Sequence, residues 1–69
     1  MSIAKQIKHL RIKRGLTQKQ LADLMGTKAQ VISAWEQDDY SAYTLSTLSR
    51  LVTALNAKLN ITIVDLDKS

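Results

Sequence analysis

The sequence predicts an all-α fold, a compact bundle of four to five helices followed by one C-terminal β-strand. Three observations indicate this fold. The chain has no proline and only two glycines, Gly15 and Gly26, so mostly helical structure with tight connections is expected. Apolar residues recur at helical spacing through most of the chain. Beyond Asn56 the spacing changes to an alternation that is typical of a strand.

The first two predicted helices are delimited by capping residues and glycines. Ser2 is placed to cap a helix that Gly15 ends. Thr17 caps a second helix over residues 17–25, Gln20 can complete its capping box, and Gly26 ends it. The apolar residues that recur at helical spacing are Ile3, Ile7 and Leu10 in the first helix, and the second is expected to face inward through Leu21, Leu24 and Met25.

Two further helices follow from the same kind of signal. Thr27 is expected to cap a third helix that runs to about Gln37, with Ile32 and Trp35 inward. After a polar connector over residues 38–43, Thr44 caps a fourth helix, and Asn56 ends it because asparagine tolerates the left-handed conformation. The broad apolar stripe of this helix consists of Leu45, Leu48, Leu51, Val52 and Leu55.

Residues 59–64 form the predicted strand, in which Leu59, Ile61 and Ile63 alternate with Asn60, Thr62 and Val64. No other segment resembles a strand, yet the backbone groups of a strand need partners. The simplest partner is the same strand in a second copy, paired across a two-fold axis through the dimerisation residues Leu59, Ile61 and Ile63. Alternatively, residues 59–64 extend the fourth helix or lie loosely on the core.

This pattern divides the chain into a helical domain over residues 1–56 and a C-terminal strand with a short tail over residues 57–69. A chain of 69 residues holds one small core and is marginally stable alone. It has no cysteine, and His9 is its single histidine, which excludes disulfides, thiolate zinc sites and histidine-rich metal cages. We therefore expect no metal and no cofactor, and a partner subunit is the remaining stabilising device.

Charge is distributed unevenly along the chain. Residues 1–30 carry seven basic residues against Asp23 alone, a net charge of +6, whereas residues 31–69 carry three basic and five acidic residues, a net charge of −2. The asymmetry indicates that one face meets a polyanion and the other end meets a different partner. A solubilising charge run on the first helix is the alternative.

The two short helices around Gly26 have the pattern of a helix-turn-helix. Ala22 lies where the third helix crosses closely, and Gly26 can adopt the positive φ that such a turn requires. Ile32 and Trp35 are placed to hold the third helix against Leu21 and Leu24. An ordinary helical hairpin in a small bundle is the alternative reading of this pattern.

The stretch from Arg11 to Leu55 resembles the lambda-repressor-like (Cro-type, XRE) DNA-binding domain. The motif residues are Leu16-Thr17-Gln18, Leu21-Ala22, Gly26-Thr27, Val31-Ile32-Ser33 and Trp35-Glu36. The C-terminal part of the chain is similar to bacterial antitoxins of the HipB and HigA kind, through Tyr43-Thr44-Leu45, Ala54-Leu55-Asn56 and Leu59-Asn60-Ile61-Thr62-Ile63. In HipB-like members the terminal strand pairs with its mate in a dimer. The resemblance implies a transcriptional repressor that binds double-stranded DNA as a homodimer.

The resemblance also implies which residues read base edges. The third helix would lie in the major groove, where Lys28 can donate to guanine and Gln30 can pair with adenine. Ser33 is a less selective donor or acceptor, and Ala29 offers only a methyl group, to thymine. The base-reading set is Lys28, Ala29, Gln30, Ser33 and Ala34.

Two further roles complete the expected site. Residues that contact phosphates set the register of the protein on the duplex without reading sequence, and they are Thr17, Gln18, Lys19, Gln37 and Tyr40. For Thr17, helix capping is an equally good reading, and the two roles can coexist. Arg11 and Glu36 resemble a structural ion pair of the family that joins the first helix to the end of the third.

An enzyme is not expected, because the single histidine has no matched carboxylate or nucleophile and neither glycine belongs to a phosphate-binding loop. No apolar run approaches the length of about 20 residues that a membrane helix needs, and the N-terminus lacks the layout of a signal peptide. We expect a cytoplasmic, nucleoid-associated protein without a membrane partner. The antitoxin resemblance implies a second partner, a kinase or ribonuclease toxin, and a stand-alone prophage or metabolic regulator is the alternative.

Overall fold

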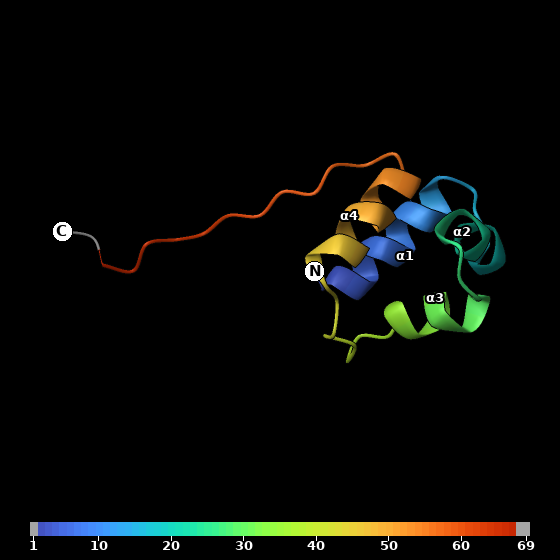
Figure 1. Ribbon diagram of the computed structural model, residues 1–69, viewed down its shortest axis with the longest axis horizontal. Helices are drawn as coiled ribbons and strands as arrows, with labels where there is room; N and C mark the ends of the chain where they lie inside the picture. Colours follow the sequence, from blue (N-terminus) through green and yellow to red (C-terminus); the bar gives the residue numbers. More distant parts are fainter. Residues whose placement is uncertain (1, 68–69) are drawn as a thin grey trace.

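The computed structural model describes residues 2–67 as a four-helix bundle with a projecting C-terminal segment (Figure 1). The helices are α1 (Ile3–Lys13), α2 (Gln18–Met25), α3 (Ala29–Trp35) and α4 (Leu45–Ala54). We call residues 2–56 the body and residues 57–67 the tail. The all-α prediction is confirmed, with four helices in the part of the chain that is described.

Most of the predicted helix ends are confirmed. The hydroxyl oxygens of Ser2 and Thr44 accept hydrogen bonds from the backbone N–H groups of Lys5 (3.2 Å) and Thr47 (3.0 Å). At Thr17 the capping box is complete. Three residues that follow helices have positive φ: Gly15 and Gly26 at 70° and Asn56 at 52°.

Two details of α3 differ from the sequence prediction. Thr27 is not its N-cap: Lys28 is, without a side-chain cap hydrogen bond. The backbone N–H of Thr27 instead donates to the carbonyl oxygen of Ala22 (2.9 Å), which completes the turn that closes α2, so α3 starts one residue later. The helix also ends at Trp35 rather than near Gln37.

The core lies where α2 packs on α3 and α4, and α1 covers it through Ile7. Its fully buried large side chains are Leu21, Ile32, Leu51 and Leu55. Leu24 was expected in the core, but its side chain is 60% exposed. At about 3.6 residues per turn, Leu21, Met25 and Ala22 already form the inner arc of α2, and Leu24 falls outside that arc. Ile3 and Leu45, at the first turns of α1 and α4, are also exposed.

Two arginines donate to backbone carbonyl groups at the C-terminal ends of other helices. Arg14 donates from Nε to the carbonyl oxygen of Leu55 (2.8 Å) and from Nη2 to that of Asn56 (3.2 Å). Arg50 donates from Nη2 to the carbonyl oxygen of Met25 (2.6 Å). Because helix ends leave carbonyl groups unsatisfied and partially negative, a guanidinium is a favourable partner there. Arg14 also fixes the point at which the tail leaves the body.

The tail runs away from the bundle as an extended segment (Figure 1). It has neither helix nor strand up to residue 67, so the alternative in which it extends α4 is wrong. A strand over residues 59–64 does not form within the single chain, because no other segment of residues 2–67 lies beside it as a strand to supply backbone partners. Pairing across a dimer stays a prediction. Residues 68–69, the end of the predicted tail, lie outside the described residues.

Candidate nucleic-acid interface

The outward side of α3 is the centre of the candidate interface. Ile32 is completely buried and holds the helix on the core, while Gln30 and Ala34 on the other side are exposed. Lys28, the N-cap residue of α3, is exposed as well. Ala29 and Ser33 are half-buried at the margin of this surface. All five residues predicted to read bases thus reach the surface on one helix and its N-cap.

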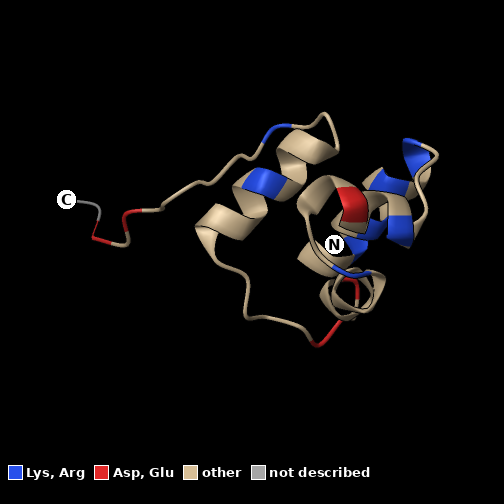
Figure 2. Cartoon of the chain, turned by 45° about the vertical axis from the view of Figure 1, so that its right-hand side comes forward, with Lys and Arg blue, Asp and Glu red and all other residues tan. Residues whose placement is uncertain are grey.

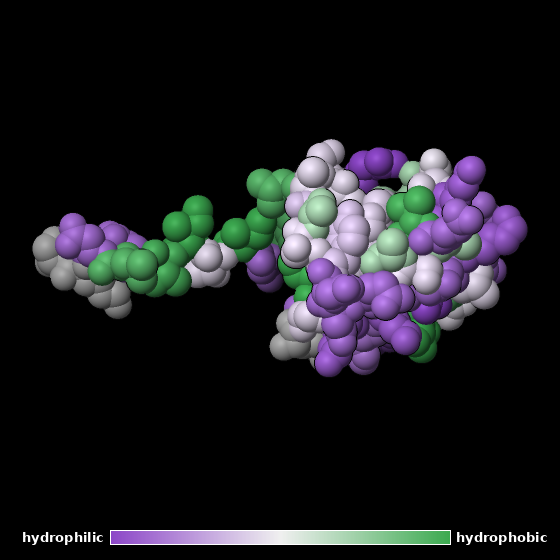
Figure 3. Space-filling view, turned by 90° about the horizontal axis from the view of Figure 1, so that it is seen from below, coloured by the Kyte–Doolittle hydropathy of each residue, from purple (hydrophilic) through white to green (hydrophobic). Residues whose placement is uncertain are grey.

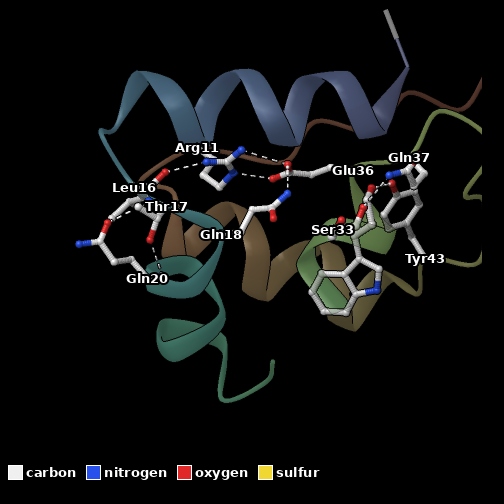
Figure 4. Close-up of polar contacts among 10 residues, drawn as sticks. Arg11, Leu16, Thr17, Gln18, Gln20, Ser33, Glu36, Gln37 and Tyr43 are labelled. Carbon is white, nitrogen blue, oxygen red and sulfur yellow. Dashed lines mark hydrogen bonds and ion pairs between the residues drawn. The ribbon is translucent and has the colours of Figure 1, made fainter. Parts of the chain in front are cut away.

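The C-terminal end of α3 continues this surface with Gln37 and Tyr40. Gln37 is exposed, and its Nε2 donates to the carbonyl oxygen of Ser33 (3.4 Å). The ring of Tyr40 packs edge-on against that of Tyr43, with centroids 4.7 Å apart and planes at 70°. The hydroxyl of Tyr43 donates in turn to the carbonyl oxygen of Trp35 (Figure 4). The connector after α3 is therefore fixed to the helix through aromatic side chains.

The surroundings of Tyr43 displace the pKa of its phenol. Burial raises the pKa of its phenol above the ordinary value of 10.0, and the nearby Tyr40 and Glu36 raise it further. Each of these effects disfavours the phenolate anion. Tyr43 is therefore neutral at physiological pH and keeps the proton that it donates to Trp35.

The N-terminal end of α2 contacts Glu36, at the C-terminal end of α3, through Gln18 and is tightly organised (Figure 4). The Thr17 hydroxyl accepts from the backbone N–H of Gln20 (3.0 Å), and the Gln20 side chain accepts from that of Thr17 (2.8 Å). Lys19 is exposed and lies 3.6 Å from the carboxylate of Asp23. Thr17 is a capping residue, which leaves its second expected role, contact with a phosphate, as a prediction.

Arg11 and Glu36 form an ion pair that is almost removed from solvent, with side chains 11% and 3% exposed. The guanidinium donates through Nε to Oε2 (2.7 Å) and through Nη2 to Oε1 (3.1 Å) of the carboxylate. Its Nη1 donates to the carbonyl oxygen of Leu16 (2.8 Å) (Figure 4). One side chain thus joins α1, the turn before α2 and the end of α3, which fixes the mutual orientation of the three helices.

Gln18 takes part in this cluster, which the sequence analysis did not foresee. Its side-chain Nε2 donates to Oε1 of Glu36 (3.2 Å), and the residue is half-buried. Gln18 was predicted to contact a phosphate, whereas its amide nitrogen is directed to the ion pair. The carbonyl-capping roles of Arg14 and Arg50 were missed as well, and no local sequence signal marks them, because their partners lie 41 and 25 positions away.

Basic residues lie mainly on the body, whereas the end of the tail carries Asp65 and Asp67 (Figure 2). No helix within residues 2–67 is both long enough and apolar enough to pass through a membrane. Residues 2–67 also hold no group of three or more histidine, cysteine or acidic residues arranged to bind a metal ion. The features that stand out are the polar side of α3 and the charge around it.

Comparison with known families decides the class of the domain. The family model described as helix-turn-helix matches residues 7–67. The chain belongs to the helix-turn-helix family. The match supports the lambda-repressor-like form suggested by the sequence motifs and makes this a DNA-binding transcription-regulator domain. A search of curated proteins found no match. The similarity of the C-terminal part of the chain, from Tyr43 onward, to antitoxins therefore stays a prediction.

Proposed function

We propose that this helix-turn-helix protein is a sequence-specific repressor that acts as a homodimer on a near-palindromic operator. The observation that carries the proposal is the outward polar side of α3, which no other part of the body covers. A single α-helix fits the major groove of B-DNA, where each base pair presents a distinct pattern of donors and acceptors. Inserting α3 there leaves its buried residue, Ile32, in the core.

Within this complex Lys28 and Gln30 carry most of the specificity. Lys28 lies at the leading end of α3 and donates to guanine O6 or N7, while Gln30 pairs through two hydrogen bonds with adenine. Ser33, Ala29 and Ala34 complete the surface that faces the bases. One good bidentate pair discriminates against the wrong base by about 1–3 kcal/mol. Two such contacts in each half-site, doubled by symmetry, distinguish an operator from other duplex DNA.

Phosphate contacts position the protein on both sides of the groove. The capping box uses the backbone N–H groups of Thr17 and Gln20, so a phosphate at the N-terminus of α2 is bound by those of Gln18 and Lys19. The ammonium of Lys19 adds a charge there, and Gln37 and Tyr40 hold the opposite strand. Such contacts fix register and orientation and give binding its dependence on salt.

The dimer supplies the second half-site. Two copies joined through Leu59, Ile61 and Ile63 of their tails would place their α3 helices in successive major grooves about 34 Å apart, which a near-palindrome matches. We propose the helical domain over residues 1–56 as the DNA-binding part and residues 57–69 as the dimerisation part. The protein acts on cytoplasmic, nucleoid-associated DNA.

We further propose that the protein is the antitoxin of a toxin–antitoxin pair. The tail exposes apolar side chains and ends in Asp65 and Asp67, which suit a protein partner with an apolar and basic surface. A kinase or ribonuclease toxin is the partner that the resemblance implies, and a neighbouring gene for such an enzyme, followed by co-purification, tests it. Without a toxin partner the same domain serves as a stand-alone prophage or metabolic regulator.

The DNA-binding proposal is tested by selection from a pool of randomised duplexes. Wild-type protein is expected to enrich a near-palindromic site. Replacing Lys28 and Gln30 together with alanine should abolish discrimination between that site and random duplex in a competition assay, because the main base contacts are lost while the fold is kept. A control with Lys13→Ala and Ser46→Ala, both exposed outside α3, should keep the discrimination. Equal specificity in the α3 variant would contradict the proposal.

A further inference from the structure

From Ile61 onward, the apolar side chains of the tail are largely uncovered by the rest of residues 2–67. Ile63 is 91% and Leu66 94% exposed, and Ile61 and Val64 are more than half exposed. Figure 3 shows the tail as a largely hydrophobic projection beside the body. Aliphatic side chains stabilise a structure when they are buried away from water. The extended conformation of the tail therefore needs a second surface that covers these side chains.

An apolar groove lies on the body at the point where the tail begins. A groove of about 220 Å³ runs between α1 and α4, lined mainly by aliphatic residues such as Ile3, Leu10 and Val52, and Leu59 of the tail lines it as well. This volume is below the range of about 300–1,000 Å³ typical of small-molecule pockets, which favours a side chain as the occupant. Ile3, on the wall of the groove, remains 44% exposed.

The tail of the same chain is poorly suited to fill this groove. Residues 61–64 read Ile-Thr-Ile-Val, four β-branched residues in succession, without a glycine, proline or asparagine that would favour a reversal. Such a run favours continued extended backbone and leads away from the body. The tail of a second copy, related by a two-fold axis and antiparallel, returns toward the groove without any turn.

We propose that the two tails pair antiparallel with Ile61 at the two-fold axis, and that Ile63 of each tail packs beside Leu59 at the groove of the other copy. This inference rests on the homodimer of the proposed function and specifies its register and docking surface. A two-stranded ribbon is marginally stable by itself in water, so it needs the helical surface that the groove provides.

Symmetry and burial restrict the register. Residues that lie directly opposite each other in an antiparallel pair point to the same face of the ribbon. When the two-fold axis passes beside one residue and its copy, odd-numbered residues therefore lie opposite odd-numbered ones and even-numbered residues opposite even-numbered ones. Centring the pair on Thr62 would set Asp65 opposite Leu59. Centring it on Asn60 would require pairing at Ala57, whose N–H already donates to the carbonyl oxygen of Val52 (2.7 Å) and whose side chain packs on the core. With Ile61 at the centre, Leu59 lies opposite Ile63, and the three opposed residue pairs on this face are all aliphatic.

Cysteine cross-linking tests the register, since the natural chain has no cysteine. In Ile61→Cys the two sulfur atoms are expected directly opposite each other, and mild oxidation should yield covalent dimer. In Ile63→Cys alone the two cysteines are about four residues, or ~13 Å, apart along the ribbon, too far for a disulfide. An equimolar mixture of Leu59→Cys and Ile63→Cys should cross-link, although neither variant does so alone.

Sedimentation equilibrium tests the groove. Ile3→Lys should raise the dimer Kd by about tenfold or more, because it places a charge in the docking surface. Ile12→Lys is the matched control: Ile12 is on the same helix and 58% exposed but does not line the groove, so the change should stay within about twofold. Equal effects of the two substitutions would overturn the docking surface.

The cross-linking outcomes separate this inference from the proposed function. If Ile61→Cys fails to cross-link, or Ile63→Cys alone cross-links better, the register is wrong, whether or not wild-type protein selects a near-palindrome as a dimer. A wild-type protein that sediments as a monomer overturns the inference as well. If the wild-type protein selects no duplex at all while Ile61→Cys cross-links as expected, the DNA-binding proposal fails and the tail arrangement stands.

Discussion

The body and the tail carry apolar patterns of equal clarity, yet the side chains end in opposite environments. In the body, Leu21, Ile32, Leu51 and Leu55 are completely buried within one chain. In the tail, Ile63 and Leu66 are almost fully exposed. The comparison teaches that periodicity predicts which face of a segment is apolar, whereas burial depends on whether the chain itself supplies the opposing surface. Charge follows the same division, with basic helices in the body and an acidic end on the tail.

The largest effect is expected where the body has removed charges from water. Glu36→Ala leaves the Arg11 guanidinium buried without its carboxylate and should lower the free energy of unfolding by about 3–5 kcal/mol, measured by urea denaturation. Asp38→Ala breaks the exposed pair with Lys5, whose Nζ is 3.8 Å from the Asp38 carboxylate, and should cost less than about 1 kcal/mol. Similar decreases in the free energy of unfolding in the two variants would show that the buried Arg11–Glu36 pair stabilises the body no more than the exposed Lys5–Asp38 pair.

The next prediction contrasts apolar truncations in the two regions. Leu51→Ala creates a cavity in the core and should lower the free energy of unfolding by about 2–5 kcal/mol. Ile63→Ala should leave unfolding unchanged at protein concentrations where the chain is monomeric, since its side chain touches little in one copy, and should weaken association instead. Denaturation at two protein concentrations distinguishes these cases. A loss of monomer stability in Ile63→Ala would show that the tail packs on its own body.

The contrast explains how far the sequence predicts this molecule. Capping residues and the glycines gave the helix ends closely, because these signals act within a few residues, as at Thr17 and Thr44. Thr27 failed as a cap because its backbone N–H closes α2. Leu24 failed as a core residue because a short helix buries only part of its apolar arc. The strand needs a second chain, so sequence could propose it but one chain could not form it.

In the candidate site, too, some features could be predicted from the sequence and others could not. The exposed side of α3 follows from helical spacing, because burial of Ile32 directs Gln30 and Ala34 outward. The ion pair of Arg11 and Glu36 was predicted through family resemblance and is present in the structure. The bonds from Gln18 to Glu36 and from Arg14 to Leu55 depend on tertiary contacts between distant positions, which spacing along the chain does not encode.

The smallest effect concerns pH. The raised pKa of Tyr43 means that the unfolded chain loses its phenolic proton first as pH rises above about 10. Stability that depends on the neutral phenol is therefore complete below that pH and declines as pH rises toward the pKa of the folded state. Tyr43→Phe removes the hydrogen bond to Trp35, at a cost of about 1 kcal/mol near neutrality, and should flatten the alkaline decline. An unchanged alkaline slope in thermal or urea denaturation would contradict this.

The central claim is that the body, through α3, meets DNA, while the tail meets protein. Amide chemical-shift mapping tests it most directly, by titrating labelled protein with a duplex recovered by selection. The account predicts that the largest shifts fall on residues 28–34 and on the N-terminal turn of α2 at residues 17–19, with residues 61–67 almost unchanged. Shifts concentrated in the tail, with α3 unaffected, would contradict it.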